Sequence, residues 1–424
     1  MTICRHDEKK GNTMRNITLT LALLLVALVS FAQEENNKLA GGDISMLPEY
    51  EAANVKYTDR NGTRITDLLT YFRDEAGFNI ARVRIFVDPN KKTGVVQDLD
   101  YVLPLAIRIK EAGLKLMLDF HYSDTWADPS NQWTPAAWTS LTEEELADTI
   151  YGYTKMVLDT LVKSNAAPDY IQTGNEISYG MLWGPQGTSS PLSCNTSKDD
   201  NWERFRTLLT QAGKACREMC PDAKIIIHTE RTGNWSTTKG IYERLSTMDY
   251  DIIGLSYYPE WHNNLNNLKN VITGCHNTFP DKSVMIVETG YYNNYYPSNA
   301  TYKFQSTWPV SPEGQKKFLD DLVEAVKDLD ALIGILYWFP EENPYNNHVY
   351  EPWYNHGLFN PKTGKVSDAL FSLQKFRGIY TPVEDITPQP WQNGDIYTVT
   401  GLKLSPADNL PHGVYIQNGK KIVK

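Results

Sequence analysis

The chain has 424 residues, of which 41% are hydrophobic and 22% are charged, so it has an ordinary globular composition and is long enough for one large α/β barrel or two domains. Its net charge of -10 argues against a nucleic-acid partner, because phosphates attract basic surfaces. The 11 Trp and 25 Tyr are the unusual entries, and such aromatic faces either fill a core or stack on ligands.

The N-terminal residues have the pattern of an export signal. Met14 begins a short basic region, the apolar run 19–29 follows, and Ser30-Phe31-Ala32 offers a cleavage site between small residues. The apolar run is too short to span a membrane as a helix, and no Cys lies at the cleavage point to carry a lipid anchor. We therefore expect residues 1–32 to be upstream residues and a signal peptide. The mature chain is expected to be periplasmic, cell-surface or secreted, without a membrane-spanning segment.

Short apolar runs alternate with helical patterns along most of the chain, which is typical of parallel βα units. The runs expected to be strands are 41–45, 80–86, 115–121, 170–174, 224–228, 251–256, 284–287 and 334–338. Helical patterns between them include 103–111, 143–163, 202–217 and 314–328. Eight such repeats predict an α/β fold, a (β/α)8 TIM barrel with elaborated βα loops over residues 33–380.

Residues 381–424 follow the predicted barrel as a linker and a C-terminal tail. Proline and acidic residues are frequent in 382–390, and short β-like runs such as 410–416 come later. The tail resembles the short β-rich tails of secreted bacterial proteins, which suggests a secretion or sorting segment. A hairpin that packs on the barrel is an equally open alternative.

Four cysteines remain once the predicted leader is removed: Cys194, Cys216, Cys220 and Cys275. In an exported protein they permit three disulfide pairings, and the sequence does not choose among them. Cys216 and Cys220 are four residues apart on a predicted helix, an awkward spacing for a disulfide. A zinc site is the weaker interpretation, because no His cluster accompanies the cysteines.

Polar and aromatic residues gather where the predicted strands end. A TIM barrel carries its active site at the C-terminal ends of the strands, so side chains there converge on one cavity. The residues at or near these ends are Arg84, Asp119, His121, Asn175, Glu176, His228, Ser256, Glu288 and Trp338.

Two glutamates among them carry the strongest functional signal. Glu176 follows Gly174-Asn175, and Glu288 follows the apolar run 284–287. A carboxylate directly after a buried strand is costly unless chemistry or a partner needs it. Paired carboxyls of this kind are typical of glycosidases, which use a protonated general acid and an ionised nucleophile. The carboxyls should lie about 5–5.5 Å apart in a retaining enzyme and about 6.5–9.5 Å apart in an inverting one.

Residues near the two glutamates fit supporting roles. Asn175 can bind a sugar 2-hydroxyl, although Asn is also a common helix cap. Arg84, His228 and Tyr258 are candidate donors to Glu288. A purely structural ion pair between Arg84 and Glu288 is the alternative.

Asp119 and His121 lie on one face of their strand, because alternate residues point the same way. An Asp-x-His pair could bind a metal ion, but further ligands on neighbouring strands would be needed and His228 is the only candidate. We therefore predict no metal, and we assign both residues to sugar hydroxyls and to support of the glutamates. A structural, internally satisfied pair is the alternative.

Tryptophans in and near the strand-end loops are candidate platforms for sugar rings. The favoured candidates are Trp126, Trp183, Trp261 and Trp338, with Trp133 and Trp138 as weaker ones. The alternative is that they cover the edges of the barrel.

At these residues the chain resembles the family 53 glycoside hydrolases, the endo-β-1,4-galactanases of clan A. The most specific stretch is Asp119-Phe120-His121-Tyr122-Ser123-Asp124, and Gly174-Asn175-Glu176 is another. All matching stretches follow in order: 42–45, 48–49, 82–89, 118–129, 132, 172–177, 180–183, 253–259, 287–289 and 337–338.

The resemblance implies a retaining mechanism on the β-1,4-galactan of pectin and type I arabinogalactan, with Glu176 as acid/base and Glu288 as nucleophile. The chain departs from the family at Glu230-Arg231-Thr232 and at Phe339-Pro340-Glu341, so product length does not follow from the resemblance. Some relatives hold a structural calcium ion in late loops. Its ligands have no match here and are not carried over, and catalysis is expected to need no cofactor.

Three other functions stay open on the sequence alone. Another clan A glycosidase, such as a mannanase or a xylanase, would share the glutamates. A non-catalytic galactan-binding barrel would need neither glutamate, and a metal-dependent hydrolase would lose activity with a chelator. The expected partner is the polysaccharide substrate alone, and the chain is expected to be monomeric.

Overall fold

The structure is a computed structural model that describes residues 38–92, 94–347, 349, 355–379 and four short strands between 396 and 423. The chain divides into two compact units, Met1–Ile379 and Tyr380–Lys424. The predicted signal peptide, 1–32, lies outside the described residues.

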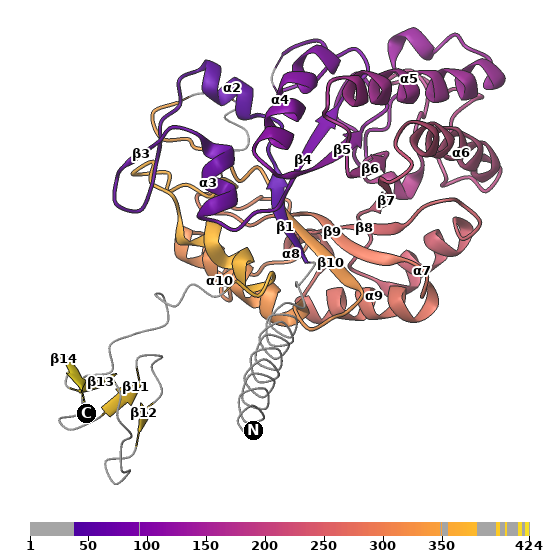
Figure 1. Cartoon of the computed structure of the whole chain (residues 1–424). Helices are drawn as coiled ribbons and strands as arrows, with labels where there is room; N and C mark the ends of the chain where they lie inside the picture. The colour runs from indigo at the N-terminus through magenta and orange to yellow at the C-terminus, as the bar shows by residue number, and fades with distance from the viewer. Residues whose placement is uncertain are drawn as a thin grey trace, which may run out of the picture. The chain divides into compact units, whose positions relative to one another are not determined.

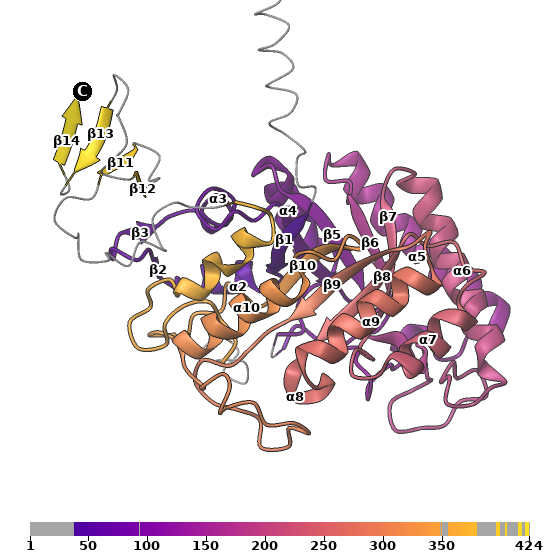
Figure 2. The ribbon, with the colours of Figure 1, turned by 90° about the horizontal axis from the view of Figure 1, so that it is seen from below.

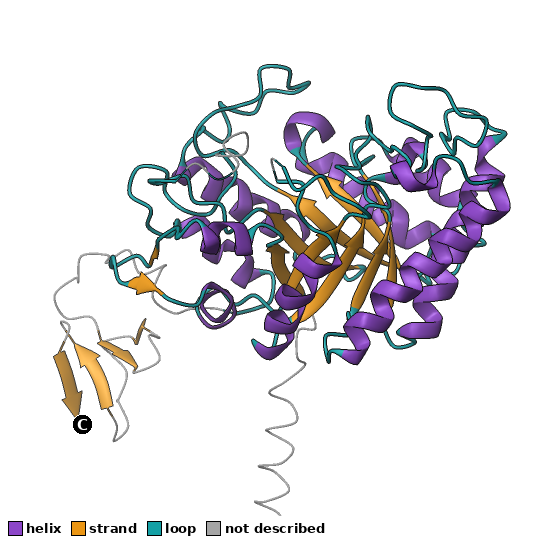
Figure 3. Ribbon diagram, turned by 90° about the horizontal axis from the view of Figure 1, so that it is seen from above, coloured by secondary structure: helices purple, strands orange, loops and turns teal. Residues whose placement is uncertain are grey.

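Eight parallel strands close into a barrel in the order β1-β10-β9-β8-β7-β6-β5-β4 (Figures 1 and 3), which confirms the predicted (β/α)8 TIM barrel. Each strand pairs with its sequence neighbour, and β1 closes the ring against β10. The strands are β1 (Leu39–Asp43), β4 (Ile80–Ile85), β5 (Lys115–Phe120), β6 (Tyr170–Thr173), β7 (Lys224–Thr229), β8 (Ile252–Tyr257), β9 (Ser283–Thr289) and β10 (Leu332–Trp338).

Helices cover the outside of this barrel, and Figure 2 shows α5, α6, α7 and α9 along it. The predicted helix 143–163 matches α5, whose start is fixed by a capping box between Thr142 and Glu145. The helices are α2 (Leu47–Ala52), α3 (Leu68–Asp74), α4 (Leu99–Glu111), α5 (Glu143–Lys163), α6 (Asn201–Met219), α7 (Trp235–Arg244), α8 (Pro259–His262), α9 (Leu265–Thr278) and α10 (Pro312–Val326). The 3-10 helices η1 (Ala136–Trp138), η2 (Ile177–Tyr179) and η4 (Asp368–Lys375) and the hairpin β2–β3 (Tyr57–Thr58, Arg64–Ile65) complete the first unit among the described elements.

The inside of the barrel has an apolar layer below a polar one. Side chains at alternate positions of the strands form the apolar cluster, which contains Leu39, Ile80, Met117, Ile226, Ile252, Met285, Val287 and Leu336. Two or four residues further along these strands, on the same faces, lie Asp43, Arg82, Asp119, His228 and Ser256, all buried. The apolar layer therefore supports the polar groups from beneath and excludes water from them.

The second unit contains a four-stranded antiparallel sheet in the order β12-β11-β13-β14. Its strands are β11 (Ile396–Thr398), β12 (Lys403–Leu404), β13 (Val414–Gln417) and β14 (Lys420–Val423). The tail is thus β-rich, as the sequence indicates, and its function stays a prediction.

The four cysteines among the described residues are buried and unpaired, so none of the three disulfide pairings considered is present there. Burial raises the pKa of each thiol, that of Cys194 and of Cys275 to about 12. No helix within the described ranges has the length and apolar content needed to cross a bilayer.

Candidate active site

Glu288 faces the interior because β9 contains a β-bulge. Leu255 of β8 pairs with Ile286, whereas the next residue, Ser256, pairs with Glu288, so Val287 is the extra residue. Val287 belongs to the apolar cluster inside the barrel, and Glu288 lines the cavity above it. Two successive side chains therefore point inward, which a regular strand does not allow. The bulge directs the carboxyl into the site.

Glu176 lines the same cavity, and its backbone adopts a left-handed conformation. Its φ is 48°, and Gly174 two residues earlier has a φ of 105°. A Cβ on Gly174 would lie 2.7 Å from Ile177 Cγ2, so glycine is required there. A left-handed non-glycine residue costs about 1–3 kcal/mol and persists where surrounding contacts hold it, often at functional sites.

Both carboxyls line one cavity of about 1170 Å³ at the C-terminal ends of the strands. That volume exceeds the range of about 300–1,000 Å³ usual for small-molecule sites, so there is room for several units of a polymer. Other lining residues include Arg82, Arg84, His121, Trp126, Asp128, Trp133, Asn175, Glu230, Arg231, Tyr258, Glu260, Trp261, Tyr302 and Trp338.

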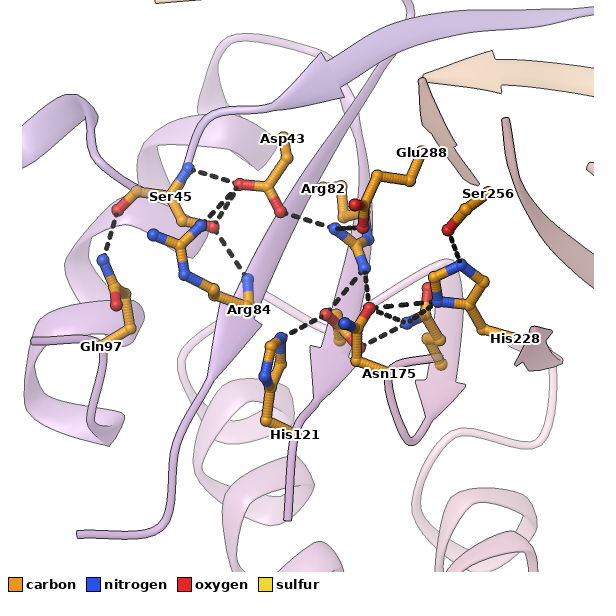
Figure 4. A network of polar contacts seen from close by, with 12 residues as sticks. Asp43, Ser45, Arg82, Arg84, Gln97, His121, Asn175, His228, Ser256 and Glu288 are labelled. Carbon is orange, nitrogen blue, oxygen red and sulfur yellow. Dashed lines mark hydrogen bonds and ion pairs between the residues drawn. The ribbon is translucent and has the colours of Figure 1, made fainter. Parts of the chain in front are cut away.

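Arg82 is the centre of a buried charge network beneath Glu288 (Figure 4). Its guanidinium lies 3.3 Å from Glu288 Oε2, 2.9 Å from Asp43 Oδ2 and 2.8 Å from Asp119 Oδ2. It also donates to Asn175 Oδ1 at 2.8 Å. Burial disfavours the charge, but Asp119, Glu288 and Asp43 outweigh it and raise the pKa of Arg82, so the cation is permanent.

The carboxyl of Glu288 has the lower pKa of the two glutamates. Burial raises its pKa to about 7, while Arg82 and a hydrogen bond from Tyr258 oppose that rise. Tyr258 donates its hydroxyl to Glu288 Oε1 at 2.8 Å. With one oxygen paired to a cation and the other to a phenol, the carboxylate is fixed in orientation, as a nucleophile needs to be.

The carboxyl of Glu176 has the higher pKa of the two. Burial raises its pKa well above the usual range, and the charges of Glu288 and Glu230 raise it further. A hydrogen bond from Ser256 to Glu176 Oε1 acts in the opposite direction. Two carboxyls with different environments in one cavity can therefore hold one proton, which resides on Glu176.

His121 and Asp119 form a support for the loop that follows β5. His121 Nε2 lies 3.0 Å from Asp119 Oδ2, and His121 Nδ1 accepts the backbone N–H of Ala127 at 2.9 Å. Asp119 Oδ1 accepts from Gln172 Nε2 at 2.6 Å. Burial disfavours the Asp119 charge, yet Arg82 and His121 keep its pKa below the usual value. His121 lines the cavity with both ring nitrogens already engaged.

The aromatic candidates divide into two groups. Trp126, Trp261 and Trp338 line the cavity, and Trp261 is 38% exposed. Trp183 is absent from the lining; its indole N–H donates to Tyr179 O, and its ring meets Trp133 edge-on at 5.8 Å. Trp133, the weaker candidate from sequence, is the one that faces the cavity. Trp138 is buried against Tyr153 instead.

The structure brings most of the expected residues together. Arg84, His121, Trp126, Asn175, Glu176, Tyr258, Trp261, Glu288 and Trp338 all line the cavity. Asp119, His228 and Trp183 do not, and Asp119 and His228 are fully buried. For Asp119 and His228, direct contact with a substrate is therefore revised to support from beneath, and Trp183 packs against Trp133 beside the lining.

Of the three candidate donors to Glu288, Tyr258 does bond to it, whereas the arginine that pairs with it is Arg82 and not Arg84. Arg84 Nη1 lies 3.2 Å from Asp43 Oδ1, and its guanidinium lies 4.3 Å from the centre of the Trp126 ring. Sequence reasoning missed Arg82 and Asp43. The signal was present, because Arg82 and Arg84 alternate on one strand and so share a face. His228 likewise bonds to Ser256 rather than to Glu288.

No group of three or more His, Cys, Asp or Glu side chains suited to a metal ion occurs in the described part of the chain. Asp119 and His121, the pair considered for a metal, instead bond to each other, and Asp119 also pairs with Arg82.

The comparisons with known proteins agree with this geometry. The model of glycosyl hydrolase family 53 matches residues 39–376. The chain is 34% identical to the arabinogalactan endo-β-1,4-galactanase A of Aspergillus niger, over 71% of this chain and 84% of that protein. It is 32% identical to the arabinogalactan endo-β-1,4-galactanase of Cellvibrio japonicus, over 77% and 86%. The solved catalytic domain of family 53 from Ignisphaera aggregans superposes with a TM-score of 0.72 at 30% identity, over 82% of this chain and 97% of that one.

The match covers the whole barrel, from its first strand to the end of η4. The curated galactanases also align over most of their own length. The chain therefore belongs to glycosyl hydrolase family 53 and is a glycoside hydrolase.

Proposed function

We propose that the chain is an exported, retaining endo-β-1,4-galactanase that hydrolyses the β-1,4-galactan of pectin and type I arabinogalactan. The observation that carries the proposal is the unequal pair of glutamates in one cavity. Glu288 is paired with Arg82 and Tyr258, whereas Glu176 is kept protonated by burial and by neighbouring carboxylates. The names of the related galactanases supply the substrate class.

In the first step, Glu288 attacks the anomeric carbon, and the bond between that carbon and the leaving oxygen breaks. Glu176 gives its proton to the leaving oxygen, so the shortened chain departs as an alcohol. Arg82 and Tyr258 hold Glu288 in line for attack. Asn175 Nδ2 donates to Ala127 O at 2.7 Å, and its second N–H, which bonds to none of the described residues, can bind a sugar 2-hydroxyl.

In the second step, Glu176 takes a proton from water, and the water oxygen attacks the anomeric carbon of the ester. Glu288 leaves as a carboxylate, and the configuration at the anomeric carbon is retained. No step draws on a metal ion or a cofactor. We propose further that the enzyme acts as a monomer after removal of residues 1–32, and that residues 381–424 serve secretion or sorting.

The decisive experiment is product analysis on linear β-1,4-galactan, with wild type and Glu288→Ala side by side and with mannan and xylan as alternative substrates. Short galactooligosaccharides from wild type alone would support both the substrate and the nucleophile. Proton NMR of the first product then tests stereochemistry, because a β-anomer released first marks retention. Cleavage of mannan or xylan in place of galactan would contradict the substrate, and an α-anomer released first would contradict retention.

A further inference from the structure

A chain of hydrogen bonds runs from His228 through Ser256 to Glu176. Ser256 Oγ lies 2.5 Å from Glu176 Oε1 and 2.8 Å from His228 Nε2. The three residues come from β7, from β8 and from the end of β6, and Figure 4 shows His228 and Ser256 side by side. Both are fully buried, so water does not compete for these bonds.

The partners of the other ring nitrogen fix the tautomer of His228. The backbone N–H of Glu176 points at Nδ1 from 3.2 Å, and Gln172 Nε2 lies 3.0 Å away. The Gln172 amide nitrogen is itself oriented by the carboxylate of Asp119 at 2.6 Å. Two donors face Nδ1, so Nδ1 accepts and carries no proton. Asn175 Oδ1, at 3.1 Å, takes its hydrogen bond from Arg82 instead.

His228 is therefore neutral, with its proton on Nε2. Burial and the nearby positive charge of Arg82 lower the pKa of His228 well below its usual value, which agrees with this state. The Nε2–H then donates to Ser256 Oγ. A serine hydroxyl has one proton, and with its oxygen accepting from His228 that proton goes to Glu176 Oε1.

Glu176 Oε1 is thus an acceptor whether the carboxyl is charged or neutral. We propose that Ser256, oriented by neutral His228, is the positioning residue that keeps the exchangeable proton of Glu176 on Oε2, the atom that serves both the leaving oxygen and the incoming water. The proposal rests on the acid/base role of Glu176 described above.

The other charged groups that face Glu176 act against its ionisation. Glu288 on β9, Glu230 after β7 and Asp128 in the loop after β5 all favour the protonated form. Ser256 favours the carboxylate, because a hydrogen bond to a charged acceptor is the stronger one. Losing the Ser256 hydroxyl should therefore raise the pKa of Glu176 and also allow the proton onto either oxygen.

The test is Ser256→Ala, with Ser372→Ala as the matched control. Ser372 is also a buried serine, but it lies in η4 and its hydroxyl has no hydrogen-bond partner among the described residues. Titration of the 13C-labelled Glu176 carboxyl by NMR, assigned by its loss in Glu176→Gln, needs no substrate. We expect an upward shift in Ser256→Ala and none in Ser372→Ala.

The kinetic counterpart is the pH profile on whichever glycan the wild type cleaves. In Ser256→Ala we expect the basic limb of kcat/KM to move to higher pH. We also expect kcat to fall about 10- to 100-fold, which is less than the rate loss expected when a general acid is removed. An unmoved Glu176 titration, or a kcat within about twofold of wild type, would overturn the proposal. An equal loss at every pH together with a lowered Tm would also overturn it, because that pattern marks a structural role alone. If the wild type does not cleave galactan, the proposed substrate is contradicted. The NMR titration of Glu176 still tests the role of Ser256, because it needs no substrate.

Discussion

Arg82 and Glu288 are joined by a buried ion pair, with Arg82 Nη1 3.3 Å from Glu288 Oε2. The same guanidinium bonds to Asp43 and Asp119, so one cation is shared by three carboxylates from β1, β5 and β9. This sharing limits how strongly Arg82 can neutralise Glu288. Glu288 is therefore only partly compensated by Arg82, which suits the nucleophilic role proposed for its carboxylate.

Arg82→Lys should therefore cost both activity and stability. An ammonium lacks the planar fork that reaches several carboxylates at once. Breaking a buried pair costs about 3–5 kcal/mol, which urea unfolding would measure alongside kcat. Arg108→Lys is the control, since Arg108 pairs with Glu51 at the surface and the change should stay within about 1 kcal/mol. If the two variants were equally stable, the ion pairs of Arg82 with Asp43, Asp119 and Glu288 would not stabilise the fold as argued.

Glu176→Gln should separate substrates by their leaving groups. A galactan needs its leaving oxygen protonated, so its hydrolysis should slow by about 100- to 10,000-fold. An aryl galactoside with an acidic phenol departs without that help, and its first step should hardly change. Steady-state rates on both substrates, with a pre-steady-state burst on the aryl one, measure the difference. Equal losses on the two substrates would argue that Glu176 is not the acid.

The sequence predicts the barrel and most of the lining because both follow from periodicity. Apolar runs give the strands, and the fold then places the strand-end residues on one cavity. The strand pattern also contains the signal for Arg82, since two alternating arginines share a face. The bulge at Val287 is different. It depends on how β9 pairs with β8, so the local pattern contains no sign that Glu288 changes face.

The sequence also does not predict which tryptophans face the cavity. Trp133 and Trp183 both lie in loops, and their sequence context does not say which faces the cavity. Their positions follow from contacts between two loops. One of these contacts is the hydrogen bond from the backbone N–H of Trp183 to the backbone carbonyl of Gln132. Likewise, the burial of His228 depends on neighbouring strands and not on its own position at a strand end.

Glu230→Gln should shift the pH profile in the direction opposite to Ser256→Ala. Glu230 is buried beside Ser178, and its negative charge raises the pKa of Glu176. Removing that charge should lower the pKa of Glu176, so the basic limb of kcat/KM should move to lower pH. Glu260→Gln is the control, because Glu260 is a buried carboxyl of the same cavity that bonds to Tyr292 instead. A basic limb that moves equally in both variants, or upward in Glu230→Gln, would contradict this assignment.

Trp261→Ala should weaken polymer binding without unfolding the protein. Trp261 lies in α8, lines the cavity and is 38% exposed, so its ring is available to a sugar face. Aromatic contacts of this kind contribute about 0.5–1.5 kcal/mol, which corresponds to roughly a 2- to 12-fold rise in KM on galactan. The Tm should stay near that of wild type, because little buried surface is lost. Trp183→Ala is the comparison: its ring packs against Trp133 away from the cavity lining, so it should lower Tm more than it raises KM. The reverse pattern, a larger KM effect for Trp183 than for Trp261, would contradict the role of Trp261 as the sugar platform.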